Sequence, residues 1–228
     1  ARALLTPDSW MVTNPQTVLE ALRRAVSLRG KLLTGDVVGI VPKEARVEVE
    51  TSDGLRRQFD YAVVAGGVWS RTLVRALGLS VSLETERGYN TTFARPGFAL
   101  EMPVFFAEHG FVASPLVDGI RVGGAVELAA VDAPPNFARA AAMRRKMRRY
   151  VPQLPEEGGI EWMGCRPSTP DSLPVIGRSP DNPRIIFAFG HGHLGLTLSA
   201  VTARQVAALV AGHPTEQMLG AFSIARFK

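Results

Sequence analysis

The stretch "IIFAFGHGHLGLTLSAVTARQ" (residues 185–205) decides the fold class of this 228-residue chain. Its apolar start predicts a strand, and the run after the glycines predicts a helix. Between them, Gly190, Gly192 and Gly195 spell G-x-G-x-x-G, the pattern of a loop that binds the pyrophosphate of a dinucleotide. A strand, a glycine turn and a helix in this order predict an α/β architecture.

The residues leave three interpretations of this loop open. A dinucleotide fingerprint needs a second strand after the helix, ending in an acidic residue that holds the ribose, and residues 212–228 predict no such strand. A metal site would combine His191 and His193 with His109, but the loop offers no neighbouring Cys or carboxylate ligand. The third interpretation is a tight turn in which glycine permits close packing.

The chain before this stretch also predicts alternating elements. "NPQTVLEALRRAVSLRG" (14–30) predicts a helix, since Asn14 can cap it, Pro15 suits its first position and Gly30 its end. "YAVVAGGVWS" (61–70) predicts a strand buried in a parallel sheet, a glycine break and a helix capped by Ser70 that ends at Gly78. Further short strands are predicted over 31–33, 37–41, 46–51 and 55–59, with a turn at Asp53-Gly54.

Residues 80–135 differ in character, because Phe, Thr and Val alternate there with Gly and Pro turns. This pattern predicts an antiparallel sheet, followed by a helix over 136–150. The fold class we expect is mixed α/β and α+β: part of a Rossmann-like domain, 1–80 and 161–228, interleaved with an antiparallel-sheet domain, 81–160.

Composition narrows the function classes. The chain is 46% hydrophobic and 21% charged, which is ordinary for a folded protein, and much of its net charge of +5 lies in "ARAAAMRRKMRRY" (138–150). We therefore expect no nucleic-acid partner. Cys165 is the only cysteine, so the chain can form no internal disulfide, which fits a reducing compartment. No signal peptide is visible, and no apolar run reaches the ~18 residues of a membrane span. We therefore predict a cytoplasmic protein. The start at Ala1, in mid-pattern, suggests processing or the C-terminal portion of a longer protein.

Three stretches together resemble a known family. "GCRPSTPDSLPVIG" (164–177) predicts a proline-stiffened loop that presents Arg166, "ERGYN" lies at 86–90, and "GHGHLGLTLS" at 190–199. With "VVAGGVWS" (63–70), these resemble the FAD-dependent amine oxidoreductases of the D-amino-acid dehydrogenase, glycine oxidase and sarcosine oxidase kind. The similarity is closest to the D-amino-acid dehydrogenase branch and runs from residue 14 to the end of the chain.

The resemblance implies FAD as cofactor. It places the glycine loop along the pyrimidine edge of the flavin, where backbone N–H groups and a helix dipole stabilise negative charge. It implies a second contact at the glycine break and a backbone contact to the adenine at Val37. The implied cofactor residues are Val37, Gly66, Gly67, Trp69, His191, Gly192, His193, Leu194, Gly195, Leu196 and Thr197.

The resemblance also implies a reaction. Arg166 would bind the substrate carboxylate, and Tyr89 and Phe111 would be pocket walls, although both residues also suit the core of a sheet. The implied activity is oxidative deamination of small D-amino acids by hydride transfer to FAD, with no side chain assigned as a base. The alternatives are an oxygen-using glycine or sarcosine oxidase, and a non-catalytic or partner-requiring flavoprotein subunit.

Two features depart from the family pattern. The fingerprint that binds the FAD pyrophosphate belongs at the family's N-terminus and is absent from this chain, as is the first strand of the cofactor sheet. Cys165 lies about one residue from the position that carries covalent flavin in some sarcosine oxidases, and we interpret it as a half-buried structural thiol.

The basic run 138–150 is either a solvated helix face or a peripheral contact with the inner membrane, where a quinone accepts the electrons.

Overall fold

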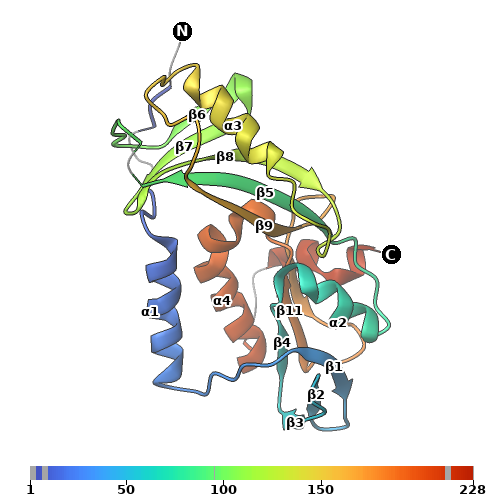
Figure 1. Ribbon diagram of the computed structural model, residues 1–228. Coiled ribbons are helices and arrows are strands. Elements are labelled where there is room, and N and C mark those ends of the chain that lie inside the picture. Colours follow the sequence, from blue (N-terminus) through green and yellow to red (C-terminus); the bar gives the residue numbers. More distant parts are fainter. Residues whose placement is uncertain (1–3, 7–9, 95, 214–216, 228) are drawn as a thin grey trace. The chain divides into compact units, whose positions relative to one another are not determined.

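Figure 1 shows the computed structural model, which describes residues 4–6, 10–94, 96–213 and 217–227. The chain divides into two compact units, and it leaves and re-enters each of them. We describe each unit by itself. Unit 1 consists of Ala1–Leu33, Tyr89–Ala125 and Pro135–Met163. Unit 2 consists of Thr34–Gly88, Val126–Pro134 and Gly164–Lys228.

The first sheet of unit 2 contains the strand predicted at 185–189. Its order is β10-β11-β4, with β11 parallel to β4 and antiparallel to β10. Ile185 and Phe187 of β11 are fully buried, which explains the continuous apolar run. The prediction missed β10, whose Gly and Arg interrupt the apolar pattern. The strands are β4 (Ala62–Val64), β10 (Val175–Arg178) and β11 (Ile185–Phe189).

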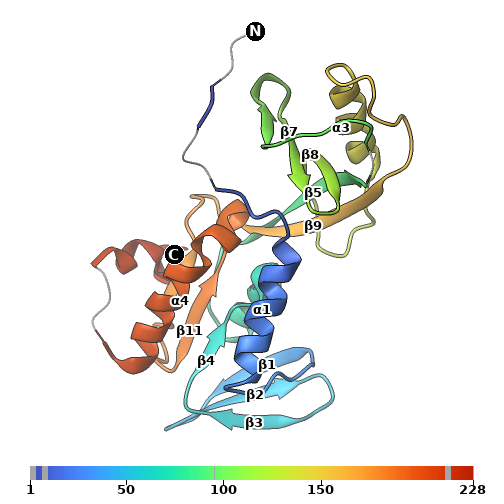
Figure 2. The same cartoon turned by 90° about the vertical axis from the view of Figure 1, so that its left-hand side faces the viewer.

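The helix predicted after the glycine loop is confirmed as α4 (Gly195–Ala211). It packs against β10 and β11 and lies alongside β11 in Figures 1 and 2. Arg178 donates a hydrogen bond to the carbonyl of Leu209 near the end of the helix, where a cation complements the helix dipole. Gly212 follows at φ +71°, the left-handed conformation that ends many helices.

One property of this helix differs from the sequence-based expectation. The segment Gly192–Ala211 has a mean hydropathy of 1.5 over its most apolar window, so by length and composition it qualifies as a candidate membrane span. Half of its polar residues are the small Thr197, Ser199 and Thr202, which interrupt the apolar run without lowering its mean hydropathy far. Mostly buried core helices of soluble proteins meet the same criterion, whereas only 11% of this window is buried.

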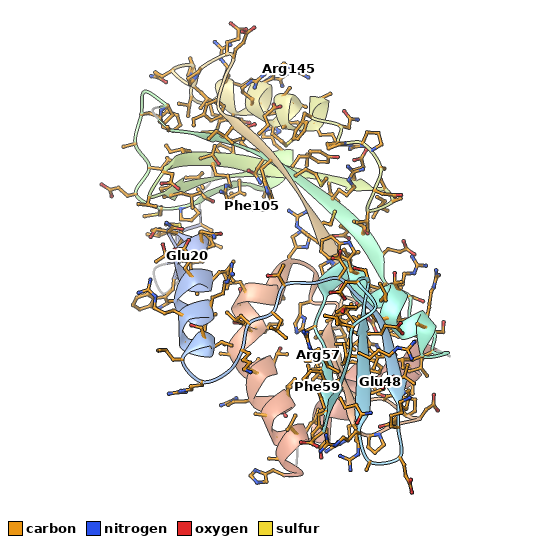
Figure 3. All side chains as sticks on the ribbon, turned by 60° about the horizontal axis from the view of Figure 1, so that its bottom comes forward. Glu20, Glu48, Arg57, Phe59, Phe105 and Arg145 are labelled. Carbon is orange, nitrogen blue, oxygen red and sulfur yellow. The ribbon has the colours of Figure 1, made fainter. Side chains whose placement is uncertain are left out.

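A second sheet of unit 2 is an antiparallel meander in the order β1-β2-β3. Gly54 adopts φ +80° in the turn before β3, as the Asp-Gly pair predicts. Figure 3 shows Glu48 on β2 and Arg57 and Phe59 on β3. The strand predicted over 31–33 is wrong, because such a short run cannot separate a strand from a connection. The strands are β1 (Val37–Pro42), β2 (Val47–Thr51) and β3 (Arg56–Phe59).

A 3-10 turn, η1 (Gly67–Trp69), and the helix α2 (Ser70–Ala76) follow β4. The helix ends near Gly78 as predicted, and Gly78 has φ +77°. The capping role predicted for Ser70 is wrong. Trp69 holds the cap position, and the Oγ atom of Ser70 is buried without a hydrogen-bond partner. Because the 3-10 turn η1 leads directly into α2, Ser70 is the first residue of the helix and not the residue before it.

The five-stranded sheet has the order β6-β7-β8-β5-β9, and β5, β8 and β9 each contribute residues to both units. Antiparallel pairing is recorded for β6 with β7 and for β7 with β8, as the alternating pattern predicts. The strands are β5 (Glu84–Phe93), β6 (Val104–Phe106), β7 (Phe111–Leu116), β8 (Gly119–Leu128) and β9 (Ile160–Ser168).

Two predicted helices of unit 1 are confirmed. The helix α3 (Ala138–Arg148) buries Met143 and Met147 against Phe111 and Val122 of the sheet. The helix α1 (Pro15–Ser27) begins as the sequence predicts, since the side chain of Asn14 accepts a hydrogen bond from the N–H of Thr17 at 3.2 Å. The remaining elements are short 3-10 turns: η2 (Ala107–His109), η3 (Gly192–Leu194), η4 (Gln217–Phe222) and η5 (Ile224–Phe227).

Candidate cofactor and substrate site

An apolar groove of about 840 Å³ lies in unit 2. This volume is typical of small-molecule sites, which range over about 300–1,000 Å³. The groove brings together Val37, Gly66 and Trp69, three of the residues that the resemblance assigns to the cofactor. Its lining residues are Gly35, Asp36, Val37, Ile40, Val49, Phe59, Tyr61, Ala62, Val63, Val64, Ala65, Gly66, Trp69, Thr72 and Leu73.

The glycine break after β4 shapes one side of this groove. Gly67 has φ +58°, a conformation that side chains rarely adopt, and it begins the turn η1. The turn carries Trp69, whose side chain is 64% exposed. An exposed indole beside an apolar groove offers a flat surface to a planar aromatic ligand.

The glycine loop between β11 and α4 is the second predicted cofactor contact. Gly190 has φ +81° and Gly192 has φ +52°, left-handed conformations that favour glycine at both positions. Leu194 precedes α4 and makes no side-chain capping bond, and the first turn of α4 carries no acidic residue. These features leave the positive end of the helix dipole available to negative charge. In the described part of the chain no strand follows α4, although a dinucleotide fingerprint needs one.

The two histidines of this loop have different surroundings. His191 is half-buried and bonded to Thr202 of α4, and burial lowers the pKa of its imidazole below the usual 6.5. The side chain of His193 is 58% exposed, and its Nδ1 atom lies 3.8 Å from Oε2 of Glu86 on β5. Among the described residues, no group of three His, Cys, Asp or Glu side chains is arranged to hold a metal ion.

Arg166 lies on a strand, which corrects the predicted proline-stiffened loop. It belongs to β9, the edge strand of the five-stranded sheet. An edge strand tolerates Pro167, because a residue without an N–H group can face the unpaired side. Burial lowers the pKa of Arg166, while the negative charge of Glu86 raises it. Its Nη1 atom is buried and has no hydrogen-bond partner in the described part of the chain.

The turn after β9 is held by a charged contact. Arg226 of η5 donates to Asp171 from Nε at 2.7 Å and from Nη2 at 3.4 Å. These bonds lower the pKa of Asp171 to about 2. Arg226 also donates to the carbonyl of Leu173 at 2.7 Å. The C-terminal turn therefore anchors the segment that follows Arg166 along the chain.

The predicted pocket walls both lie in the core of unit 1. Tyr89 is 1% exposed, and its hydroxyl accepts a hydrogen bond from the N–H of Asn136 at 3.1 Å. Phe111 is fully buried and stacks on Phe106, with ring centroids 4.4 Å apart. Both side chains are thus core residues of the sheet, the second interpretation of the sequence, and their contact with substrate stays a prediction.

Sequence reasoning missed two neighbours of Arg166. Gly88 and Glu86 lie on β5, the strand that neighbours β9, although they are distant from Arg166 in the sequence. The one available signal was "ERGYN", which contains both residues and was used only as part of the family resemblance. The predicted half-buried character of Cys165 is confirmed.

The residues of unit 2 fit FAD, the cofactor that the resemblance implies. The groove is large and mainly apolar, as an aromatic ring system requires, and Gly66 and Gly67 let a ligand approach the backbone closely. The amino end of α4 suits negative charge. The buried, unpartnered Nη1 atom of Arg166 suits a carboxylate.

Comparison with known proteins points the same way. The profile of the DAO family, described as FAD dependent oxidoreductase, matches residues 1–209. A D-amino-acid oxidase of Bradyrhizobium diazoefficiens is 39% identical over 172 residues, covering 74% of this chain and 41% of the relative. A D-amino acid dehydrogenase of Paramagnetospirillum magneticum is 37% identical over 180 residues, covering 78% of this chain and 42% of the relative.

The fold has close solved counterparts. Glycine oxidase from Geobacillus kaustophilus superimposes with a TM-score of 0.81 and 26% sequence identity. The superposition covers 91% of this chain and 56% of that structure. The chain therefore spans about two fifths of the length of the two curated relatives and little more than half of the solved structure.

Proposed function

This chain belongs to the DAO family of FAD-dependent oxidoreductases, and we propose that its protein oxidatively deaminates small D-amino acids. The observation that carries the proposal is the guanidinium of Arg166, whose buried Nη1 atom lacks a partner among the described residues. A buried charged donor without a partner is costly, and a substrate carboxylate supplies the missing acceptors.

Unit 2 supplies the residues that would hold FAD. Val37, Gly66, Gly67 and Trp69 would contact it from the groove, and the loop from His191 to Thr197 would contact the flavin edge. The bound cofactor would supply the oxidising chemistry, as an acceptor for the hydride of the substrate α-carbon. The imino acid left behind would then be hydrolysed by water to a keto acid and ammonia. The backbone N–H groups at the amino end of α4 would stabilise negative charge there.

The role of Arg166 is to orient the substrate. A guanidinium binds a carboxylate through two parallel hydrogen bonds and so fixes the direction of the α-carbon. Burial of the Nη1 atom strengthens this contact, because the local dielectric is lower there than in water. No side chain of the described residues is assigned as a base.

The stereochemical part of the proposal rests on the relatives. The D-amino-acid oxidase and D-amino acid dehydrogenase are 39% and 37% identical to this chain, whereas a glycine oxidase of Bacillus licheniformis is 28% identical. We propose a quinone or another acceptor in place of oxygen, as in the dehydrogenase branch. The oxygen-using oxidase is the second candidate, supported by the name of the relative with 39% identity.

The basic helix α3 bears on the proposed peripheral contact with the inner membrane face. Arg148 pairs with Glu156 at 3.0 Å, and Arg144 lies 3.7 Å from Glu161. Arg145, which Figure 3 labels, is exposed, and so is Arg149. Each exposed basic residue would contribute about 1 kcal/mol at an acidic lipid surface, so α3 alone supports only a weak contact.

The test uses the complete reading frame, because the chain spans only part of its relatives. The holoenzyme is mixed anaerobically with D-alanine, and the flavin absorbance is followed. We expect bleaching with D-alanine and none with L-alanine. Hydrogen peroxide formed in air would favour the oxidase alternative, and a colourless protein would favour the non-catalytic or partner-requiring subunit. Bleaching with L-alanine alone would overturn the proposal.

Two variants test the assigned residue. Arg166→Ala is expected to raise KM at least tenfold while the flavin stays bound, since a charge-assisted bidentate contact is lost. Arg145→Ala is the matched control, because that arginine is exposed on α3 and far from the described site residues in sequence. An unchanged KM in Arg166→Ala would remove Arg166 from its role.

A further inference from the structure

The guanidinium of Arg166 lies where the side chain of another residue at position 88 would begin. A Cβ atom added to Gly88 would lie 2.3 Å from Cζ, 2.3 Å from Nη2 and 2.4 Å from Nη1 of Arg166. Three nearly equal distances mean that the plane of the guanidinium faces this point broadside. Gly88 is itself buried, so the guanidinium fills the space that a side chain would occupy.

Gly88 is not required for its backbone conformation. It lies within β5 and is absent from the described glycines that have positive φ, unlike Gly67, Gly190 and Gly192. Any residue can adopt the extended conformation of a strand interior, where glycine is normally unfavourable. A strand glycine of this kind often marks a close approach by another group, and here that group is Arg166.

We propose that Gly88 is the positioning residue for Arg166 and thereby sets how tightly the substrate carboxylate is bound. The proposal rests on the proposed function, in which Arg166 binds that carboxylate. An arginine side chain has several rotatable bonds, and resting its guanidinium on the backbone of β5 restricts them. The fork is then held in one orientation before substrate arrives, which lowers the entropic cost of the bidentate contact.

The substitution Gly88→Ala tests this directly in the holoenzyme. The backbone accepts alanine, but the new Cβ forces the guanidinium to move by more than an ångström, since carbon contacts lie at about 3.5–4.0 Å. The ligand is 2-methylalanine, which has no hydrogen on its α-carbon and so cannot be oxidised. We expect its Kd to rise between about tenfold and a hundredfold, the cost of a misplaced orienting group.

Gly39→Ala is the matched control. Gly39 also lies within a strand, but its added Cβ would be 3.6 Å from the nearest atom, an ordinary contact. The Kd for 2-methylalanine and the flavin spectrum should both stay at wild-type values in this variant. A rise in Kd equal to that of Gly88→Ala would show that the effect is not specific to Arg166.

A double-mutant cycle separates positioning from a general effect on the fold. Arg166→Ala alone should raise Kd, and Gly88→Ala should add no further loss in that background. An additive loss, or an unchanged Kd in Gly88→Ala when Arg166→Ala weakens binding, would overturn the proposal. An unaltered Kd in Arg166→Ala would instead refute the substrate site of the proposed function.

Crystallography gives a readout that does not depend on activity. In Gly88→Ala the guanidinium should be displaced from β5, and in the wild-type complex with 2-methylalanine it should lie over Gly88 with the carboxylate on its free edge. A wild-type structure with the guanidinium away from Gly88 would contradict the proposal, even if the variant did not fold.

Discussion

The Nε2 atom of His191 lies 3.0 Å from the Oγ1 atom of Thr202, so the glycine loop is bonded to the helix that follows it. Thr202 is 8% exposed, and the burial that surrounds the pair lowers the pKa of His191 below 6.5. The imidazole is therefore neutral near pH 7. Its hydrogen bond to the hydroxyl of Thr202 then forms without the cost of burying a charged ring.

This contact predicts a pH-dependent stability. Because the folded pKa of His191 is lower than the unfolded value of 6.5, the unfolded state binds the proton more readily. The contribution of His191 is complete above pH 6.5 and is lost as the pH falls below it towards the folded pKa. His191→Gln should remove this dependence, measured as Tm between pH 5 and pH 8.

The control is His213→Gln, which alters an exposed histidine just beyond α4. It should show the same fall in Tm below pH 6.5 as the wild-type protein. If His191→Gln also follows the wild-type curve, another group is responsible for the dependence.

A buried ion pair predicts that replacing one partner lowers the free energy of unfolding more than replacing both. Arg87 is fully buried, its Nη1 lies 3.7 Å from Oε2 of Glu127, and its Nη2 donates to the carbonyl of Ala133 at 2.8 Å. Glu127→Gln leaves a buried charge without compensation and should lower the free energy of unfolding by about 3–5 kcal/mol. Adding Arg87→Met should recover much of this loss, as measured by urea unfolding.

The exposed pair Arg71–Glu84, at 2.9 Å, is the matched comparison. The side chain of Glu84 is 65% exposed, so Glu84→Gln should cost less than about 1 kcal/mol. Losses of equal size at Glu127 and Glu84, or no recovery in the double variant, would contradict the buried-pair argument.

Local signals carried most of the successful fold predictions. The start of α1 follows from Asn14 and Pro15, and the turn before β3 follows from Asp53-Gly54, because capping and turn geometry depend on adjacent residues. β9 was missed because Pro167 and the prolines that follow the strand indicate a loop, and only the position of the strand at a sheet edge makes Pro167 acceptable. That position depends on residues far along the chain.

The same distinction applies to the candidate site. Val37, Gly66 and Trp69 were proposed from family resemblance, and the structure lines one groove with all three. The contact between Gly88 and Arg166 was not predictable, because it depends on which residues of β5 and β9 are opposite each other. Side-chain alternation identifies the faces of each strand, but it does not determine the register between two strands.

The charge of Glu86 predicts a preference among substrates, given the proposed function. Its carboxylate raises the pKa of Arg166 and would repel a second carboxylate on a bound amino acid. Glu86→Gln should raise the ratio of kcat/KM for D-aspartate to that for D-alanine roughly fivefold, the equivalent of about 1 kcal/mol. Glu84→Gln, two residues earlier on β5, should leave the ratio unchanged. An unchanged ratio in Glu86→Gln would place the second carboxylate away from Glu86.

Two glycines of the G-x-G-x-x-G stretch predict different effects of an alanine substitution on the free energy of unfolding. Gly190 has φ +81°, and a Cβ there would lie 3.3 Å from the side chain of Thr169. Gly195 has the helical angles φ −56° and ψ −46°, and its Cβ would make an ordinary contact of 3.7 Å with His191.

Gly190→Ala should therefore lower the free energy of unfolding by about 1–2 kcal/mol, the cost of a left-handed residue. Gly195→Ala should be neutral or should raise it by up to about 1 kcal/mol, because alanine favours the helix. In a pyrophosphate-binding fingerprint the third glycine is needed for close packing of helix on strand. An equal loss in Gly195→Ala, measured by urea unfolding, would therefore restore that interpretation of the loop, whereas the expected difference would show that Gly195 is not needed for packing of the helix on the strand.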